Sequence, residues 1–159
     1  MTDLSPVQVG VAGEYFVAAE LSRRGYIASI TLRNTRGVDI LASNASASRQ
    51  VAIQVKTNQG NSPDWILQAK AEDYFADNLY YVFVNLKLPQ ERPDFYIVPS
   101  RVVADYVRTR HARWLETPGK QGQQHKNSSM RKFQDHDGQY LEAWDLLGLG
   151  EYPAELSQT

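Results

Sequence analysis

The sequence contains no cysteine among its 159 residues. Disulfide bonds, thiolate metal sites and cysteine nucleophiles are therefore excluded, and this composition fits a reducing compartment. No apolar stretch approaches the roughly 20 residues that a membrane-spanning helix needs. The N-terminal residues 1–6 also lack the basic region and the apolar run of a secretory signal. We therefore expect a cytoplasmic protein that does not enter a membrane.

Several motifs of well-known catalytic sites are also missing. The sequence has no glycine-rich loop of the P-loop or dinucleotide-binding type, and no serine lies in a nucleophile-elbow pattern. His111, His125 and His136 are separated by 14 and 11 residues, which is not the spacing of a compact zinc site. We interpret them as ordinary surface histidines.

The net charge of −1 hides an uneven distribution. Residues 101–132 contain eight Lys or Arg and two Asp or Glu, a net charge of +6, so the rest of the chain carries −7. Such a basic segment can form a surface that contacts phosphate groups, but from charge alone a solvated helix face followed by a flexible loop is the favoured interpretation. The candidates for nucleic-acid contact are Arg108, Arg110, Arg113, Lys126, Arg131 and Lys132.

Trp114 lies within this basic segment. Packing in the core is the favoured interpretation for this large side chain. Stacking on a nucleic-acid base is the alternative, because Arg110, His111 and Arg113 surround it in the sequence.

The first part of the chain predicts a helix over residues 6–24. A serine and a proline at positions 5 and 6 provide a cap and a first helical residue, and Gly25 can end the helix. Glu14 lies on the apolar stripe of this helix, whereas Glu20 lies off it and is expected to be solvated.

The rest of the chain predicts a mixed sheet. Apolar, β-branched and aromatic runs indicate strands at 26–32, 37–42, 50–56, 65–67, 79–86 and 94–98. The short polar connection 43–49 favours an antiparallel hairpin. A helix over 100–115, a mobile loop over 117–129 and a last packed helix over 140–147 should follow. We expect one α/β domain over 1–159, with a core at about 5–100 and a helical part at about 100–150.

One candidate site lies on the predicted hairpin. Side chains alternate along a strand, so Gln54 and Lys56 project from the same face. If the hairpin sets Asp39 beside Gln54, a carboxylate, an amide oxygen and an ammonium group converge. The two oxygens suit Mg²⁺, which would activate a water beside a phosphate, and Lys56 would offset the developing charge. Glu14 would add a carboxylate from the first helix.

The order and spacing of these pieces resemble the PD-(D/E)XK nuclease superfamily, whose fold is called restriction-endonuclease-like. The matching segments are Gly13-Glu14, Ala18-Ala19-Glu20-Leu21, Gly25-Tyr26, Gly37-Val38-Asp39-Ile40 and Ile53-Gln54-Val55-Lys56. The chain is similar to the small Holliday-junction-resolvase-like and uncharacterised bacterial members. The motifs cover about residues 10–57, and the strand order extends the likeness to about residue 98.

The resemblance implies a Mg²⁺- or Mn²⁺-dependent nuclease that acts on DNA. It implies metal ligation by Asp39 and Gln54, a catalytic role for Lys56 and an auxiliary, metal-supporting role for Glu14. Many members are dimers, so a homodimer is an option. Val38 stands where the family name has proline, and Gln54 stands where most members carry an acid. The glutamine leaves an alternative open: a nuclease fold without catalysis that binds nucleic acid or protein.

Overall fold

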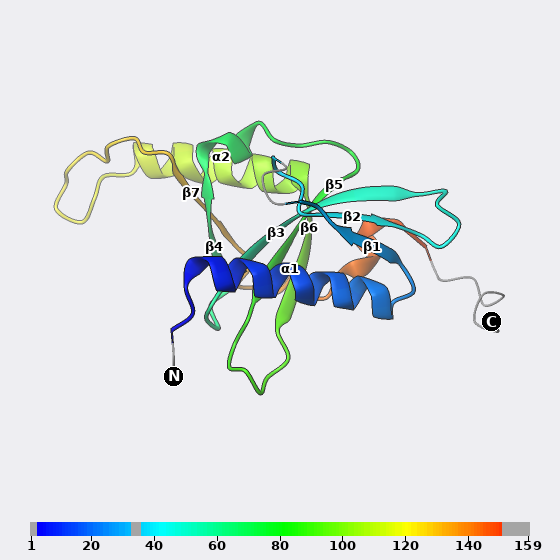
Figure 1. Ribbon diagram of the computed structural model, residues 1–159. Coiled ribbons are helices and arrows are strands. Elements are labelled where there is room, and N and C mark those ends of the chain that lie inside the picture. Colours follow the sequence, from blue (N-terminus) through cyan, green and yellow to red (C-terminus); the bar gives the residue numbers. More distant parts are fainter. Residues whose placement is uncertain (1–2, 33–35, 151–159) are drawn as a thin grey trace.

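The structure is a computed structural model that describes residues 3–32 and 36–150. Its centre is a five-stranded sheet with the strand order β1-β2-β3-β5-β6 (Figure 1). The strands are β1 (Ile27–Ile30), β2 (Ile40–Ser43), β3 (Gln50–Asn58), β5 (Leu79–Asn85) and β6 (Asp94–Pro99). β3 and β5 pair in parallel, and the other neighbours pair antiparallel. The expected mixed α/β sheet is confirmed.

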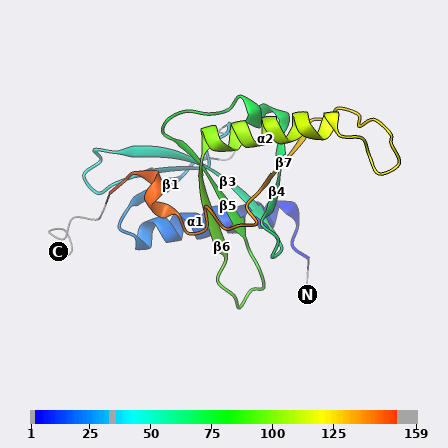
Figure 2. The same ribbon diagram turned by 180° about the vertical axis from the view of Figure 1, so that it is seen from behind.

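Two layers cover the sheet. The helix α1 (Pro6–Arg23) packs on one face, and α2 (Ser100–Glu116) lies on the other together with a small sheet of β4 (Asp64–Gln68) and β7 (Met130–Gln134) (Figures 1 and 2). Each face has its own apolar cluster. Along β3, Val55 faces α1, whereas Gln54 and Lys56 face the β4–β7 side. The sheet therefore separates the α1 layer from the polar face of β3.

The local signals of α1 are those that the sequence predicts. The Ser5 hydroxyl accepts from Gln8 N–H, and the Gln8 side chain accepts from Ser5 N–H, which forms a capping box. The expectation that Glu20 is solvated is wrong. Glu20 is only 6% exposed, and its carboxylate pairs with Arg24 and with Arg92, the latter at 3.1 Å. Arg24 is a local partner four residues on, but Arg92 comes from a distant segment, and a helical wheel cannot reveal that approach.

The C-terminal part differs from the expected helical region. Residues 130–134 form β7, which pairs antiparallel with β4 from Asp64↔Gln134 to Gln68↔Met130. The expected helix over 140–147 is wrong, because Leu141 forms a bridge to Tyr96 of β6 and only the 3₁₀ turn η2 (Trp144–Leu147) follows. Asp135 accepts hydrogen bonds from two backbone N–H groups after Gly138, which hold a tight turn just before this segment.

No helix within the described ranges has both the length and the apolar character needed to cross a membrane.

Candidate active site

Asp39 enters the site from the chain just before β2. Its N–H donates to Ile53 O at 2.8 Å, and its carbonyl accepts from Thr31 N–H at 2.9 Å. Two residues earlier, Gly37 has φ +72°, and a Cβ at this position would overlap the Tyr74 ring. Glycine is therefore required at residue 37 for both its left-handed backbone and its lack of a side chain.

The hairpin register places the predicted polar groups on one face. Ile40 pairs with Ile53, so Asp39, the residue just before β2, lies beside Gln54. One oxygen of the Asp39 carboxylate accepts from Val55 N–H at 2.7 Å, which fixes the acid against β3. Gln54 and Lys56 are two positions apart and line the same cavity. The structure thus brings Asp39, Gln54 and Lys56 to one place.

The cavity beside these residues has a volume of about 590 Å³. Its lining includes three cationic side chains, those of Arg36, Lys56 and Lys70, and the aromatic rings of Tyr74 and Tyr81. A cavity with three cations and one adjacent carboxylate has a net positive charge. That charge favours an anion such as a phosphate group.

Burial shifts the pKa of the acid in this site upward. Desolvation raises the pKa of Asp39 above its ordinary value of 3.8, while the hydrogen bond from Val55 and the charge of Lys56 oppose the shift. The pKa of Tyr74 is also raised, by burial and by the nearby Asp39 charge. The protein therefore stabilises the ionised form of Asp39 less well than water does. Ionisable groups with a shifted pKa are common at functional sites.

Burial shifts the pKa of the base in the opposite direction. Desolvation lowers the pKa of Lys56 below 10.5, and the charge of Lys70 lowers it further, whereas Asp39 opposes both effects. The two lysines therefore repel each other across the cavity. An anion bound between them would relieve that repulsion.

Glu14 lies in the other layer, on α1. It is a partly buried residue of α1, which packs on the opposite face of the sheet. The preceding Gly13 contacts Thr57, next to Lys56, so α1 crosses β3 at the level of the site. Glu14 is therefore near the end of β3 that carries Lys56. Its participation in the site stays a prediction.

The donor atoms of this site are oxygens, the type of ligand that a hard divalent cation prefers. They are few in number. Asp39 supplies a carboxylate with one oxygen bound to Val55 N–H. Gln54, which supplies an amide oxygen, is 8% exposed and lines the cavity. Within the described ranges, no three His, Asp or Glu side chains gather into a metal cluster. Mg²⁺ commonly binds through one or two carboxylates plus phosphate and water, so these residues fit Mg²⁺ when a phosphate completes its shell.

The basic residues predicted to contact nucleic acid lie in different environments. Arg110, Arg113 and Lys126 are exposed, and Arg108 is exposed but pairs with Asp105 at 3.2 Å. Lys132 lies 3.4 Å from an acid, Asp64.

Arg131 has a structural environment instead. It is 7% exposed, its guanidinium pairs with Glu72, and it donates to the carbonyls of Ser128 and Met130. Because these contacts use the guanidinium of Arg131, we do not include Arg131 among the proposed phosphate contacts.

Trp114 on α2 differs from the expected core packing. Trp114 is 40% exposed and stacks on His125, with ring centroids 4.1 Å apart, and on His111 at 5.6 Å. Core packing is therefore wrong for this tryptophan. The third histidine, His136, lies 3.3 Å from Asp64, so the three histidines do not converge.

Sequence reasoning missed Lys70 as a member of the site. Lys70 belongs to the short 3₁₀ turn η1 (Ala69–Glu72), which follows β4. It reaches the cavity only because β4 pairs with β7 and folds over the face of β3 that carries Lys56. No local pattern in the sequence signals this placement.

No protein-family model and no curated protein sequence matches the chain. The structure is similar to that of a bacterial homing endonuclease, I-Ssp6803I, with 13% identity and a TM-score of 0.54 over 98% of this chain and 99% of the other. It also aligns with Hjc, a Holliday junction resolvase from the archaeal hyperthermophile Archaeoglobus fulgidus, with 18% identity and a TM-score of 0.45 over 93% and 94% of the two chains. The restriction-endonuclease-like fold expected from the sequence is confirmed.

Proposed function

We propose that this protein is a metal-dependent nuclease that hydrolyses phosphodiester bonds in DNA. The observation that carries the proposal is the convergence of Asp39, Gln54 and Lys56 at a cationic cavity. The similar bacterial structure is a homing endonuclease, which favours DNA as the substrate.

The cationic side chains would hold the phosphate of the substrate. Lys56, Lys70 and Arg36 all line the cavity. Asp39 and Gln54 would hold Mg²⁺ or Mn²⁺, and Glu14 would support the ion from α1. The metal would supply a more acidic bound water and charge stabilisation at the phosphoryl oxygens.

Lys56 would act on the attacking water and on the reacting phosphate. Its ammonium group projects from the same face of β3 as the Gln54 amide, two residues away. A preorganised cation at that position offsets the negative charge that develops during hydrolysis. Its lowered pKa also means that the ammonium form persists only below an alkaline limit.

The exposed cations of α2 and the following loop would position the DNA. Arg110, Arg113 and Lys126 are exposed, and Arg108 and Lys132 can exchange an acidic neighbour for a phosphate. Contacts of this kind set the register of the DNA without reading its sequence.

Substitution of Lys56 tests this function. Wild type should cut plasmid or branched DNA with Mg²⁺ or Mn²⁺, and Lys56→Ala should cut at least about 100-fold more slowly because a transition-state cation is removed. DNA binding should persist in Lys56→Ala. Lys87→Ala is the matched control, because Lys87 pairs with Asp94 at 2.7 Å and does not line the cavity. If wild type and Lys56→Ala behave alike on every DNA, the proposal that this protein is a nuclease is refuted.

A binding module without catalysis is the second candidate. It is favoured by Gln54, which gives the site one carboxylate fewer than an Asp or Glu would. Such a protein should bind DNA with an affinity that falls steeply as salt rises, with no cleavage at any metal concentration. Binding that does not respond to salt would instead indicate a protein partner.

A further inference from the structure

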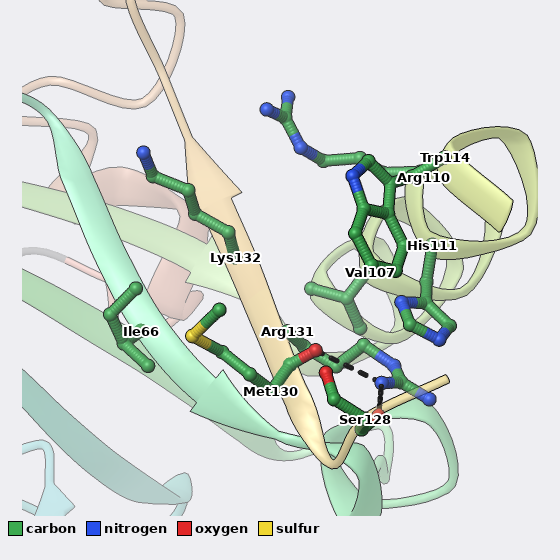
Figure 3. A pocket seen from close by; sticks show the side chains of 9 residues that line it. All are labelled: Ile66, Val107, Arg110, His111, Trp114, Ser128, Met130, Arg131 and Lys132. Carbon is green, nitrogen blue, oxygen red and sulfur yellow. Dashed lines mark hydrogen bonds between the residues drawn. The ribbon is translucent and has the colours of Figure 1, made fainter. Parts of the chain in front are cut away.

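A second pocket, which the proposed chemistry does not use, lies between α2 and the outer face of β4 and β7. It has a volume of about 210 Å³. Figure 3 shows that Trp114, His111 and Arg110 enter it from α2, Lys132 and Met130 from β7, and Ile66 from β4. The volume is below that of pockets for drug-sized ligands, so it suits one small group.

The walls of this pocket are apolar and exposed. Ile66 is 55% exposed, Met130 57% and Trp114 40%. Three large apolar side chains around one hollow mark a binding site more strongly than the same side chains scattered over a surface.

Trp114 provides a fixed, flat wall. His125 stacks on its indole ring with an interplanar angle of 20°, and His111 lies at 27°. His111 Nε2 is also within hydrogen-bond distance of Asn127 Oδ1, at 2.8 Å. The loop after α2 therefore holds the indole in place before any ligand arrives, which reduces the entropy lost on binding.

Cations surround the apolar walls. Arg110 lines the pocket and donates a hydrogen bond to a neutral group, the Tyr106 hydroxyl, at 3.2 Å. Lys132 lines the pocket as well. Among the described residues, neither Arg110 nor Arg113 forms an ion pair with an acid. Lys132 also lies 3.4 Å from Asp64, and it can exchange this acid for a phosphate. An apolar slot with cations at its rim complements a flat base attached to a charged backbone.

The pocket is next to the candidate active site. Ile66 lines both this pocket and the cavity that contains Gln54 and Lys56. A DNA strand with a phosphate at Lys56 would therefore pass Ile66 before reaching Trp114.

We propose that this pocket binds an unpaired base of a DNA strand, with the base against Trp114 and the flanking phosphates at Arg110 and Lys132. The preferred substrates are then DNA molecules with unpaired bases near the cut, such as frayed, flapped or branched forms. This substrate preference rests on the proposed nuclease function, whereas the binding of the base does not.

Binding of a short thymidine oligonucleotide, compared with an abasic strand of equal length and charge, tests the inference. The full chain is titrated with each strand in EDTA, so that nothing is cut, and fluorescence is recorded. Trp65 and Trp144 are 1% and 5% exposed, so a change in tryptophan emission on binding reports Trp114. Wild type should bind the thymidine strand about tenfold more tightly than the abasic strand, the preference expected from stacking of a base.

Three variants make the test specific to Trp114. Trp114→Ala should bind both strands alike, and Trp114→Phe should keep most of the preference because its ring still stacks. Tyr15→Ala is the matched control, because Tyr15 is an aromatic residue of α1, 65% exposed, and should leave the preference unchanged.

The possible failures of the two proposals are distinguishable. A preference that is absent in wild type, or that survives in Trp114→Ala, overturns the pocket assignment even if DNA is cut with Mg²⁺. Displacement of the strand by equimolar free thymidine monophosphate also overturns it, because the site would then take nucleotides. A Trp114-dependent preference without any cleavage supports the pocket and refutes the nuclease.

Discussion

At the scale of single residues, Asp39 carries a charge that the fold does not fully compensate. Burial raises its pKa even though Val55 N–H and Lys56 stabilise the ionised form. An ionised group whose folded-state pKa is raised destabilises the fold above that pKa, and the cost vanishes once the group is protonated in both states. The negative charge of Asp39 therefore does not stabilise the fold. The function that we propose for it is metal binding.

Asp39→Asn tests this reading of the carboxylate. The amide oxygen can still accept from Val55 N–H, and the uncompensated charge is removed. The variant should therefore be as stable as wild type at pH 7, or more stable, while cleavage is lost. Urea denaturation at a series of pH values checks this: any gain should shrink as the pH falls towards 3.8. Lower stability than wild type at pH 7 would contradict the account.

Lys56 gives a prediction for alkaline pH. Because burial and Lys70 lower its pKa, the proposed ammonium role should be lost as the pH rises through a value below 10.5. The cleavage rate should fall in that range. Lys56→Arg keeps its charge throughout, so its residual rate should not show the fall. A wild-type rate that continues to rise would indicate that the neutral amine is the active form.

The residues of the site were predictable from the sequence to different degrees. Gln54 and Lys56 share a face because strands alternate, and the short hairpin connection set Asp39 beside them. Lys70 was invisible, because it joins the cavity through the long-range pairing of β4 with β7. Local periodicity determines the face of a strand, but tertiary pairing determines what lies opposite that face.

At the scale of elements, the contact between α1 and β3 holds the two layers in register. A Cβ on Gly13 would overlap the Thr57 hydroxyl, whereas a Cβ on Gly10 would meet nothing within 4 Å. The Thr57 hydroxyl is buried and has no hydrogen-bond partner among the described residues. The helix can therefore lie this close to β3 only because residue 13 is glycine.

Two alanine substitutions in the same helix test this contact. Gly13→Ala should lower the free energy of unfolding by roughly 1–3 kcal/mol through overpacking. Gly10→Ala should raise it by up to about 1 kcal/mol, because alanine is the better helix former. Urea denaturation of both variants provides the comparison. If the two variants shift stability equally, the close approach of α1 to Thr57 is wrong.

Elements with strong local signals were predicted, and elements that depend on distant partners were not. α1 has a capping box and a terminal glycine, and β5 is a continuous apolar run buried between β3 and β6. β7, Met130–Gln134, is short and contains two cations and a glutamine. Its strand conformation comes from pairing with β4, so its own residues give little warning of it.

At the scale of the whole molecule, one charge network connects the end of α1 to the β5–β6 loop and the C-terminal turn. Arg92 lies 3.1 Å from Glu20 and 2.6 Å from Glu142, and Trp144 Nε1 donates to Glu142 at 2.8 Å. Burial alone would raise the pKa of Glu142, but the hydrogen bonds from Arg92 and Trp144 lower it below 4.5. This network should therefore stabilise the fold above pH 4.5 and weaken as the pH falls through the lowered pKa.

Arg92→Ala tests the network. It should reduce the free energy of unfolding at pH 7 by about 1–2 kcal/mol, a value discounted because Arg92 is 48% exposed. The loss should shrink in acid, where Glu142 is protonated. Arg101→Ala is the matched control, because Arg101 is 60% exposed and its partner Asp77 is 4.0 Å away, and it should change stability by less than about 0.5 kcal/mol. An equal effect of the two variants at pH 7 would argue against a network role.

The most direct test of the proposed metal site is the anomalous scattering of Mn²⁺ in crystals grown with a short DNA. The account predicts one ion within about 2.0–2.4 Å of an Asp39 carboxylate oxygen and the Gln54 side-chain oxygen, beside a DNA phosphate that contacts Lys56. Well-diffracting crystals with DNA bound and no ion at these residues, or with the ion elsewhere, would contradict it.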